Sequence, residues 1–88
     1  MTQRVVSVSA GKSWLMIGVV ENHHQLRWTE PPLAGLIPEV EAMLRAMPGF
    51  VGVVQRQHLI LKIEFAETAQ IAAAKAAKGN EIIRLLGG

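Results

Sequence analysis

The stretch His58–Phe65, HLILKIEF, carries the clearest structural signal in the sequence. Apolar side chains occupy every second position, and the charged residues Lys62 and Glu64 stand between them. Successive residues of a strand point to opposite faces of a sheet, so this pattern predicts a strand with one buried and one solvated face. The apolar positions are Leu59, Leu61, Ile63 and Phe65.

Three further strands are expected on the N-terminal side of this stretch. Residues 4–9 (RVVSVS) alternate valine with serine, and residues 14–20 (WLMIGVV) form a mostly apolar run after a turn that contains Gly11. This order predicts a hairpin over residues 4–20. Residues 25–29 (QLRWT) are expected to include a short extended piece with Leu26 and Trp28 facing inward. Residues 50–54 (FVGVV) are expected to form a buried strand.

Two helices are predicted between and after these strands. Pro38 suits a first helical position, and apolar residues then recur at helical spacing until Pro48 and Gly49 end the segment. The second helix is expected to be capped by Thr68, to run through the alanine-rich stretch 69–78 and to end at Gly79. The remaining segment 81–86 (EIIRLL) is predicted to be the final strand.

These elements predict a single small α+β domain over residues 1–88 with a flexible Gly-Gly tail at 87–88. The preferred architecture is the β-grasp (ubiquitin-like) fold, with a mixed sheet and one main helix, because a hairpin opens the chain and a strand would close it. In that fold, residues 82–86 pair with residues 4–9. The alternative is a ferredoxin-like β-α-β-β-α-β arrangement over residues 14–86, with residues 1–12 as an extra edge strand.

Composition argues against several classes of function. The chain has no cysteine, which excludes disulfides, cysteine-based metal sites and a thiol nucleophile. Its nine lysines and arginines are spread along the sequence and few aromatic residues accompany them, so we expect no nucleic-acid binding. The apolar runs are too short to cross a bilayer, so no membrane partner is expected and a cytoplasmic location is favoured.

The sequence offers no convincing catalytic or metal-binding set. It contains no aspartate, and it lacks the G-x-S-x-G turn that presents a nucleophilic serine. The three histidines, His23, His24 and His58, are interpreted as solvated loop residues without a third ligand at metal spacing. We therefore expect a protein that is not an enzyme and that carries no cofactor and no metal.

The two glycines that close the sequence point to one specific chemistry. Activation of a carboxylate as an acyl-adenylate requires the chain end to enter a narrow ATP site, and glycine has no Cβ to obstruct that entry. On this interpretation the carboxylate of Gly88 is the reactive group and Gly87 allows threading. Leu85 and Leu86 are expected to anchor the tail or to pack on the partner, and Arg84 is expected to steer the tail towards an acidic groove.

Several stretches resemble one known family. FVGVVQRQHLI at 50–60, EFAET at 64–68 and KGNEIIRLLGG at 78–88 are similar to the ubiquitin-like sulfur carriers of thiamin and molybdopterin biosynthesis, and VSVSAGKSWLMIGV at 6–19 resembles the first hairpin of ubiquitin. The resemblance implies that an E1-like adenylating enzyme activates Gly88, which then receives sulfur as a thiocarboxylate. A sulfur-accepting biosynthetic enzyme would be the second partner, and the protein would be a cosubstrate.

A binding protein of another class is the alternative hypothesis. The high apolar content with few charges leaves some apolar surface uncovered in a chain of this size. This composition fits a small non-enzymatic regulatory or inhibitory protein of ferredoxin-like fold that acts, as a homodimer, through the face of its sheet.

Overall fold

The N-terminal hairpin forms as the alternation of valine and serine predicts. The computed structural model describes residues 4–54 and 59–87. In it, β1 (Arg4–Ala10) pairs antiparallel with β2 (Trp14–Glu21) without any irregularity of register. The backbone N–H of Gly11 donates to the carbonyl of Trp14 at 2.9 Å and closes the turn between the two strands.

A second, tighter hairpin follows β2. Asn22 and His23 both have positive φ, 52° and 68°, and the short strand β3 (His24–Gln25) then pairs antiparallel with the end of β2. Two consecutive left-handed residues make a type I′ turn, whose twist matches that of the strands on either side. The expected inward positions of the next segment are confirmed, since Trp28 is fully buried and Leu26 packs against the core.

The central part of the chain forms the first helix and the second half of the sheet. A 3-10 turn, η1 (Ala34–Leu36), leads into α1 (Ile37–Arg45), which buries Val40 and Leu44. Gly49, with φ of 83°, turns the chain into β4 (Phe50–Val54). β5 (Leu61–Phe65) then pairs antiparallel with both β4 and β2. The sequence predicted β4 as a buried strand, but most of its residues are only half-buried.

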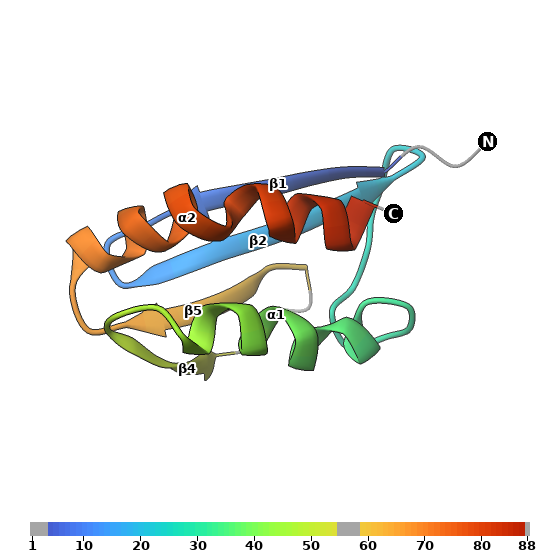
Figure 1. Ribbon diagram of the computed structural model, residues 1–88. Helices are drawn as coiled ribbons and strands as arrows, with labels where there is room; N and C mark the ends of the chain where they lie inside the picture. The colour runs from blue at the N-terminus through green and yellow to red at the C-terminus, as the bar shows by residue number, and fades with distance from the viewer. Residues whose placement is uncertain (1–3, 55–58, 88) are drawn as a thin grey trace.

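The sheet has the strand order β1-β2-β5-β4, with β3 added beside β2. Both helices lie on the same face of this sheet and make a two-layer molecule (Figure 1). Neither helix packs mainly on the hairpin that comes directly before it in the sequence. α1 follows β1 and β2 but contacts β4, and the C-terminal helix follows β4 and β5 but contacts mainly β1 and β2. The core between the layers is entirely apolar, with Leu15, Ile17, Val19, Leu61, Ile63 and Phe65 supplied by the two central strands.

The C-terminal segment differs from the sequence prediction. α2 (Thr68–Gly87) is one helix of 20 residues, and the strand predicted at 81–86 is wrong. A glycine ends a helix by adopting a left-handed conformation, whereas Gly79 continues the helical path. Ile82 and Leu86 extend the buried stripe begun by Ile71 and Ala74, and this burial favours the helix over a strand.

The start of α2 also departs from expectation. Thr68 was predicted to cap the helix, but it is the first helical residue and its hydroxyl donates to the carbonyl of Lys12 at 2.7 Å. The capping contact is made by the Gln70 side chain, whose Oε1 accepts from the backbone N–H of Glu67 at 3.0 Å. This is half of a capping box, in which a residue three positions along satisfies a free N–H.

The α+β class is thus confirmed, and the finer expectations need correction. All strand pairs among the described residues are antiparallel, so the predicted mixed sheet is not observed. Both architectures considered from the sequence end in a strand, while the described chain ends in a helix. Residues 82–86 lie over β1 as part of α2 and do not pair with it as a strand. The order of elements is hairpin, helix, hairpin, helix.

Candidate interaction surface

Within residues 4–54 and 59–87, both helices cover one face of the sheet and none covers the other. The inward residues of β2 and β5 are fully or almost fully buried under α1 and α2, so the alternate residues point to the opposite side. We call this opposite side the helix-free face. Its described residues include Val5, Ser7 and Ser9 of β1, Trp14, Met16, Gly18 and Val20 of β2, Gln25 of β3, Ile60 directly before β5, Lys62 and Glu64 of β5, and Gly52 and Val54 of β4.

Apolar side chains extend across the helix-free face. Val5 and Val20 are directly opposite each other on neighbouring strands and are 57% and 36% exposed. Trp14 and Met16 continue the apolar surface along β2 and are half-buried. Gly18 lies between these two groups and is buried, because neighbouring side chains cover it: a Cβ there would stand only 3.3 Å from Ser7 Oγ and 3.5 Å from Ile60 Cδ1.

The charges of the helix-free face lie beside its tryptophan. The ammonium group of Lys62 stands 4.5 Å from the centre of the Trp14 ring, in a cation–π contact. Glu64 is the cross-strand neighbour of Trp14 on β5. The half-buried ring thus has charged neighbours on β5. Tryptophan is enriched in protein–protein contacts, because it offers a large apolar area.

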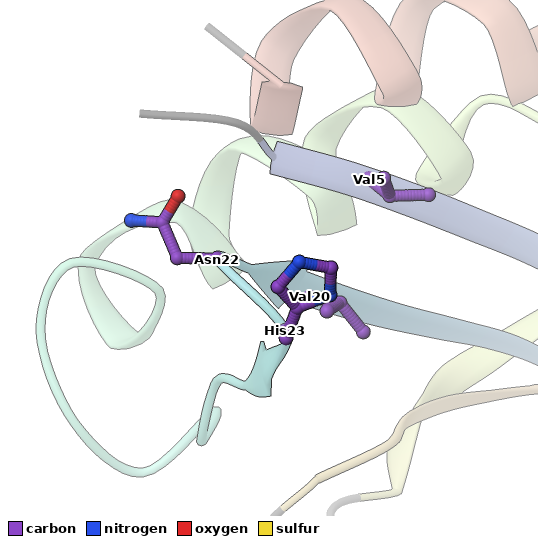
Figure 2. A pocket seen from close by; sticks show the side chains of 4 residues that line it. All are labelled: Val5, Val20, Asn22 and His23. Atoms are coloured by element: carbon purple, nitrogen blue, oxygen red, sulfur yellow. The ribbon is translucent and has the colours of Figure 1, made fainter. Parts of the chain in front are cut away.

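A shallow pocket lies at the end of this face (Figure 2). Val5 and Val20 line it together with Asn22 and His23 of the type I′ turn, and the amide of Asn22 points away from the other three side chains. Positive φ at His23 is uncommon for a residue with a Cβ. The turn therefore holds an imidazole at the pocket in place of the glycine that such turns prefer.

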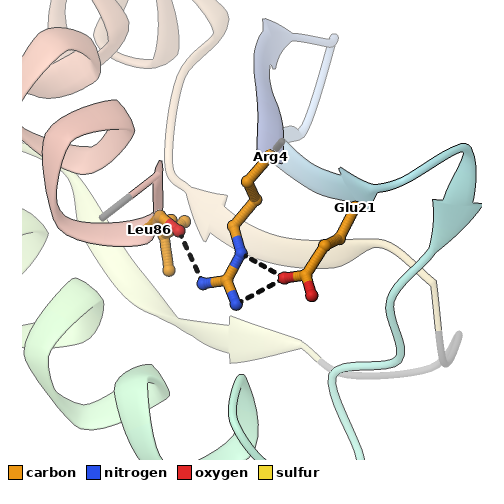
Figure 3. A network of polar contacts seen from close by, with 3 residues as sticks. All are labelled: Arg4, Glu21 and Leu86. Atoms are coloured by element: carbon orange, nitrogen blue, oxygen red, sulfur yellow. Dashed lines mark hydrogen bonds and ion pairs between the residues drawn. The ribbon is translucent and has the colours of Figure 1, made fainter. Parts of the chain in front are cut away.

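The C-terminal end of α2 is fixed to the start of the chain. Arg4 donates from Nη1 to the carbonyl of Leu86 at 2.9 Å, and its other nitrogens approach Glu21 Oε2 at 2.8 and 2.6 Å (Figure 3). Leu86 itself is fully buried. A cation at the C-terminus of a helix is favourable because the free carbonyls there carry partial negative charge.

The residues singled out for tail activation are distributed over this last turn. Arg84 is exposed, Leu85 packs partly against the core, Leu86 is buried and Gly87 is an exposed helical residue. Gly88 lies outside the described residues. The structure therefore separates Leu85 and Leu86, which face the sheet, from Arg84 and Gly87, which face solvent. An anchoring role for the two leucines fits their burial.

Two of the three histidines lie at the type I′ turn. His23 and His24 are exposed in and beside the type I′ turn, and His58 lies outside the described residues. Within residues 4–54 and 59–87, no three His, Cys, Asp or Glu side chains are placed to hold a metal ion. No helix in the same part of the chain is both long and apolar enough to cross a membrane.

Comparison of the chain with protein-family models, with curated proteins and with solved structures finds no match. The functional argument therefore rests on the chain's own surface. Sequence reasoning did not identify Val5, Val20 and Met16 as a group, although the alternation in residues 4–20 places them on one side of the hairpin.

Proposed function

We propose that this protein is a non-enzymatic binding module that contacts a protein partner through the helix-free face of its sheet. The observation that carries the proposal is the exposed pair Val5 and Val20, which continues into Trp14 and Met16 on the same face. Protein–protein contacts are enriched in tryptophan and methionine and bury an apolar centre within a polar rim. Ser9, Gln25 and Glu64 provide polar atoms around this centre.

The proposal agrees with the regulatory or inhibitory class of protein that composition suggests. The described residues offer no group of metal ligands, and the pocket beside the type I′ turn is lined by Val5, Val20, Asn22 and His23. A flat apolar surface favours recognition of another protein surface over the enclosure of a small substrate. The protein would then act by covering a surface of its partner or by holding the partner in position.

The test begins with the immobilised intact chain and an extract of the cells that produce it. A protein retained on the chain is purified and titrated directly by calorimetry against three chains: the unchanged protein, Val20→Lys and Ala73→Lys. Val20→Lys introduces a charge into the apolar centre and is expected to weaken binding roughly tenfold or more. Ala73→Lys is the matched control, because Ala73 is exposed on α2, in the other layer of the molecule. Equal affinities for both variants would contradict the proposal.

The sulfur-carrier function stays a second proposal, and the terminal Gly87–Gly88 pair is the observation that favours it. Activation requires an extended tail, yet the helix continues to Gly87 and Leu86 is fully buried. The last turn of α2 would have to unwind, which costs the burial of Leu86 and the contact of its carbonyl with Arg4. The carrier would thus need its partner to open this turn.

This requirement gives the second proposal a specific test. With ATP and an E1-like adenylating enzyme, the intact chain should support pyrophosphate exchange, and deletion of Gly88 should abolish it. Sulfide should then give a product heavier by the difference between one sulfur and one oxygen atom. Arg4→Gln should raise the exchange rate, because it removes a contact that holds the last turn closed. An unchanged rate after deletion of Gly88 would contradict the carrier function.

A further inference from the structure

The two edges of the sheet differ in how they are protected. β4 is a short edge strand of 5 residues whose register is interrupted by a bulge between Phe50 and Gly52. β1 is longer, with 7 residues in continuous register, and it contains no proline. Proteins usually guard an exposed edge strand with a charge, a proline or a bulge, since its free backbone groups can pair with another chain. β1 lacks these guards over Val5–Ala10.

The free backbone groups of β1 can be assigned from the hairpin register. Hydrogen-bonded and non-hydrogen-bonded pairs alternate in an antiparallel ladder, and the bond from Gly11 N–H to the Trp14 carbonyl fixes the phase. The N–H and C=O groups of Val6 and Val8 therefore point to the outer edge. Consistent with this phase, the carbonyl of Val19, the partner of Val6, faces away from β1 and accepts from Leu26 at 2.8 Å. No described strand pairs with this edge.

We propose that the outer edge of β1 pairs antiparallel with β1 of a second copy, about a two-fold axis at Ser7, so that the two sheets become one. This register is the one that pairs all of β1: Val6 with Val8, Arg4 with Ala10 and Ser7 with Ser7 of the second copy. It brings no unneutralised charge into the contact, because Glu21 of the same copy already holds the guanidinium of Arg4. The proposal does not depend on the partner-binding role of the helix-free face.

The position of α2 fits a second copy at this edge. α2 contacts β1 more than β2, so it lies beside the edge at which the second copy would join. The α2 helices of the two copies would therefore face each other across the proposed axis. Packed helices stand about 8–10 Å apart, and we expect this separation between them.

The C-terminal turns of α2 lie nearest to the proposed axis. Thr68 contacts Lys12 at one end of β1, and Leu86 contacts Arg4 at the other. A Cβ on Gly87 would stand 3.8 Å from Val6 Cγ2, on the residue next to Ser7. The proposed axis therefore passes beside the last turns of α2.

An exposed apolar side chain lies on these last turns of α2. Ile83 is 40% exposed in the single subunit. A second copy that joins at the edge of β1 would cover it.

The test uses sedimentation equilibrium of the full chain and a charge exchange at Ser7. The unchanged protein should have about twice the subunit mass of 9.6 kDa. Ser7→Glu alone and Ser7→Lys alone should each raise the dimer dissociation constant roughly tenfold or more, because like charges would stand directly opposite each other. An equimolar mixture of the two variants should dimerise again, since opposite charges then meet across the axis.

Ser9→Glu is the matched control. Ser9 is another exposed serine of β1, but in this register it faces Val5 of the second copy, so no like charges are placed opposite each other. This variant should keep a dissociation constant close to that of the unchanged protein. Circular dichroism of each variant verifies folding, which is expected because Ser7 and Ser9 are exposed in the single subunit.

Hydrogen exchange provides a second measurement. The amide hydrogens of Val6 and Val8 should be protected in the unchanged protein and should exchange rapidly in Ser7→Glu, in which the edge is free. A monomeric unchanged protein, a Ser7→Glu chain that dimerises normally, or a mixture that stays monomeric would each overturn the proposal. Val20→Lys, which tests partner binding, should leave the dimer intact, so failure of one proposal can be distinguished from failure of the other.

Discussion

Arg4 and Leu86 are 82 positions apart in the sequence, and a side-chain nitrogen of the first donates to the backbone carbonyl of the second at 2.9 Å. The same guanidinium forms an ion pair with Glu21. One side chain therefore joins the first strand, the second strand and the end of the last helix. This contact joins the two ends of the described chain.

Replacing Arg4 should destabilise the fold more than replacing a typical surface cation. Arg4→Met keeps much of the aliphatic stem but leaves Glu21 and the Leu86 carbonyl without the guanidinium, and we expect a loss of about 1–2 kcal/mol in the free energy of unfolding. The control is Arg45→Met, which removes an exposed pair with Glu41 on α1 and should cost about 0.5 kcal/mol or less. Urea denaturation measures both, and equal losses would contradict the bridging role.

Trp28 should be one of the least replaceable core residues. It is fully buried, and its indole N–H donates to the carbonyl of Ile17 at 3.1 Å. Trp28→Phe removes this donor and leaves a space, and it should lower the free energy of unfolding by about 2–3 kcal/mol. Trp14→Phe, at a half-buried position on the helix-free face, should cost less than about 1 kcal/mol. Thermal denaturation of the two variants measures both losses. A larger loss for Trp14→Phe than for Trp28→Phe would contradict the prediction.

The type I′ turn should become more stable when His23 is replaced by glycine. His23 holds a φ of 68°, which is unfavourable for a residue with a Cβ, and Asn-Gly is the preferred pair for this turn. His23→Gly is expected to raise the free energy of unfolding by about 0.5–1 kcal/mol. His24→Gly, in the strand that follows, should lower it instead. A decrease in both variants would show that the imidazole stabilises the turn.

Gly49 should resist substitution, whereas Gly35 should not. Gly49 has a φ of 83°, and a Cβ there would stand 1.8 Å from Gln70 Oε1, so the Gln70 side chain would have to leave the start of α2. Gly49→Ala is expected to cost about 1–2 kcal/mol. A Cβ at Gly35 meets nothing within 4 Å, so Gly35→Ala should be neutral or slightly stabilising. Chemical denaturation compares the two, and similar costs would show that the left-handed turn is not the cause.

Local patterns predicted most of the strands and the first helix. The alternation in residues 4–20 and the helical spacing around Val40 and Leu44 are confirmed. The strand predicted at 58–65 is observed over Leu61–Phe65, and Leu59, predicted on its buried face, is 38% exposed. These patterns suffice because each element has one face that must be buried, and the period of the apolar residues identifies that face.

The C-terminal segment could not be assigned from local pattern alone. Ile82, Ile83, Leu85 and Leu86 fit a strand or a helix equally well over so short a stretch, and Gly79-Asn80 has the composition of a helix end. Packing decides between them, because Ile82 and Leu86 continue the stripe of Ile71 on the sheet. A binding role for a sheet face was among the hypotheses, but its residues could not be named for a related reason: the face is defined only when both helices take the other side.

The packing of α2 on the first hairpin has a consequence for synthesis of the chain on the ribosome. The first hairpin emerges early, but the helix that directly follows it packs against β4. The first hairpin is covered instead by α2. The apolar inner side of β1 and β2 therefore stays uncovered until residues 68–87 have left the ribosome. Such long-range closure slows folding and exposes aggregation-prone strands in the meantime. We expect nascent chains that lack α2 to be bound by chaperones, and the full chain to be released from them.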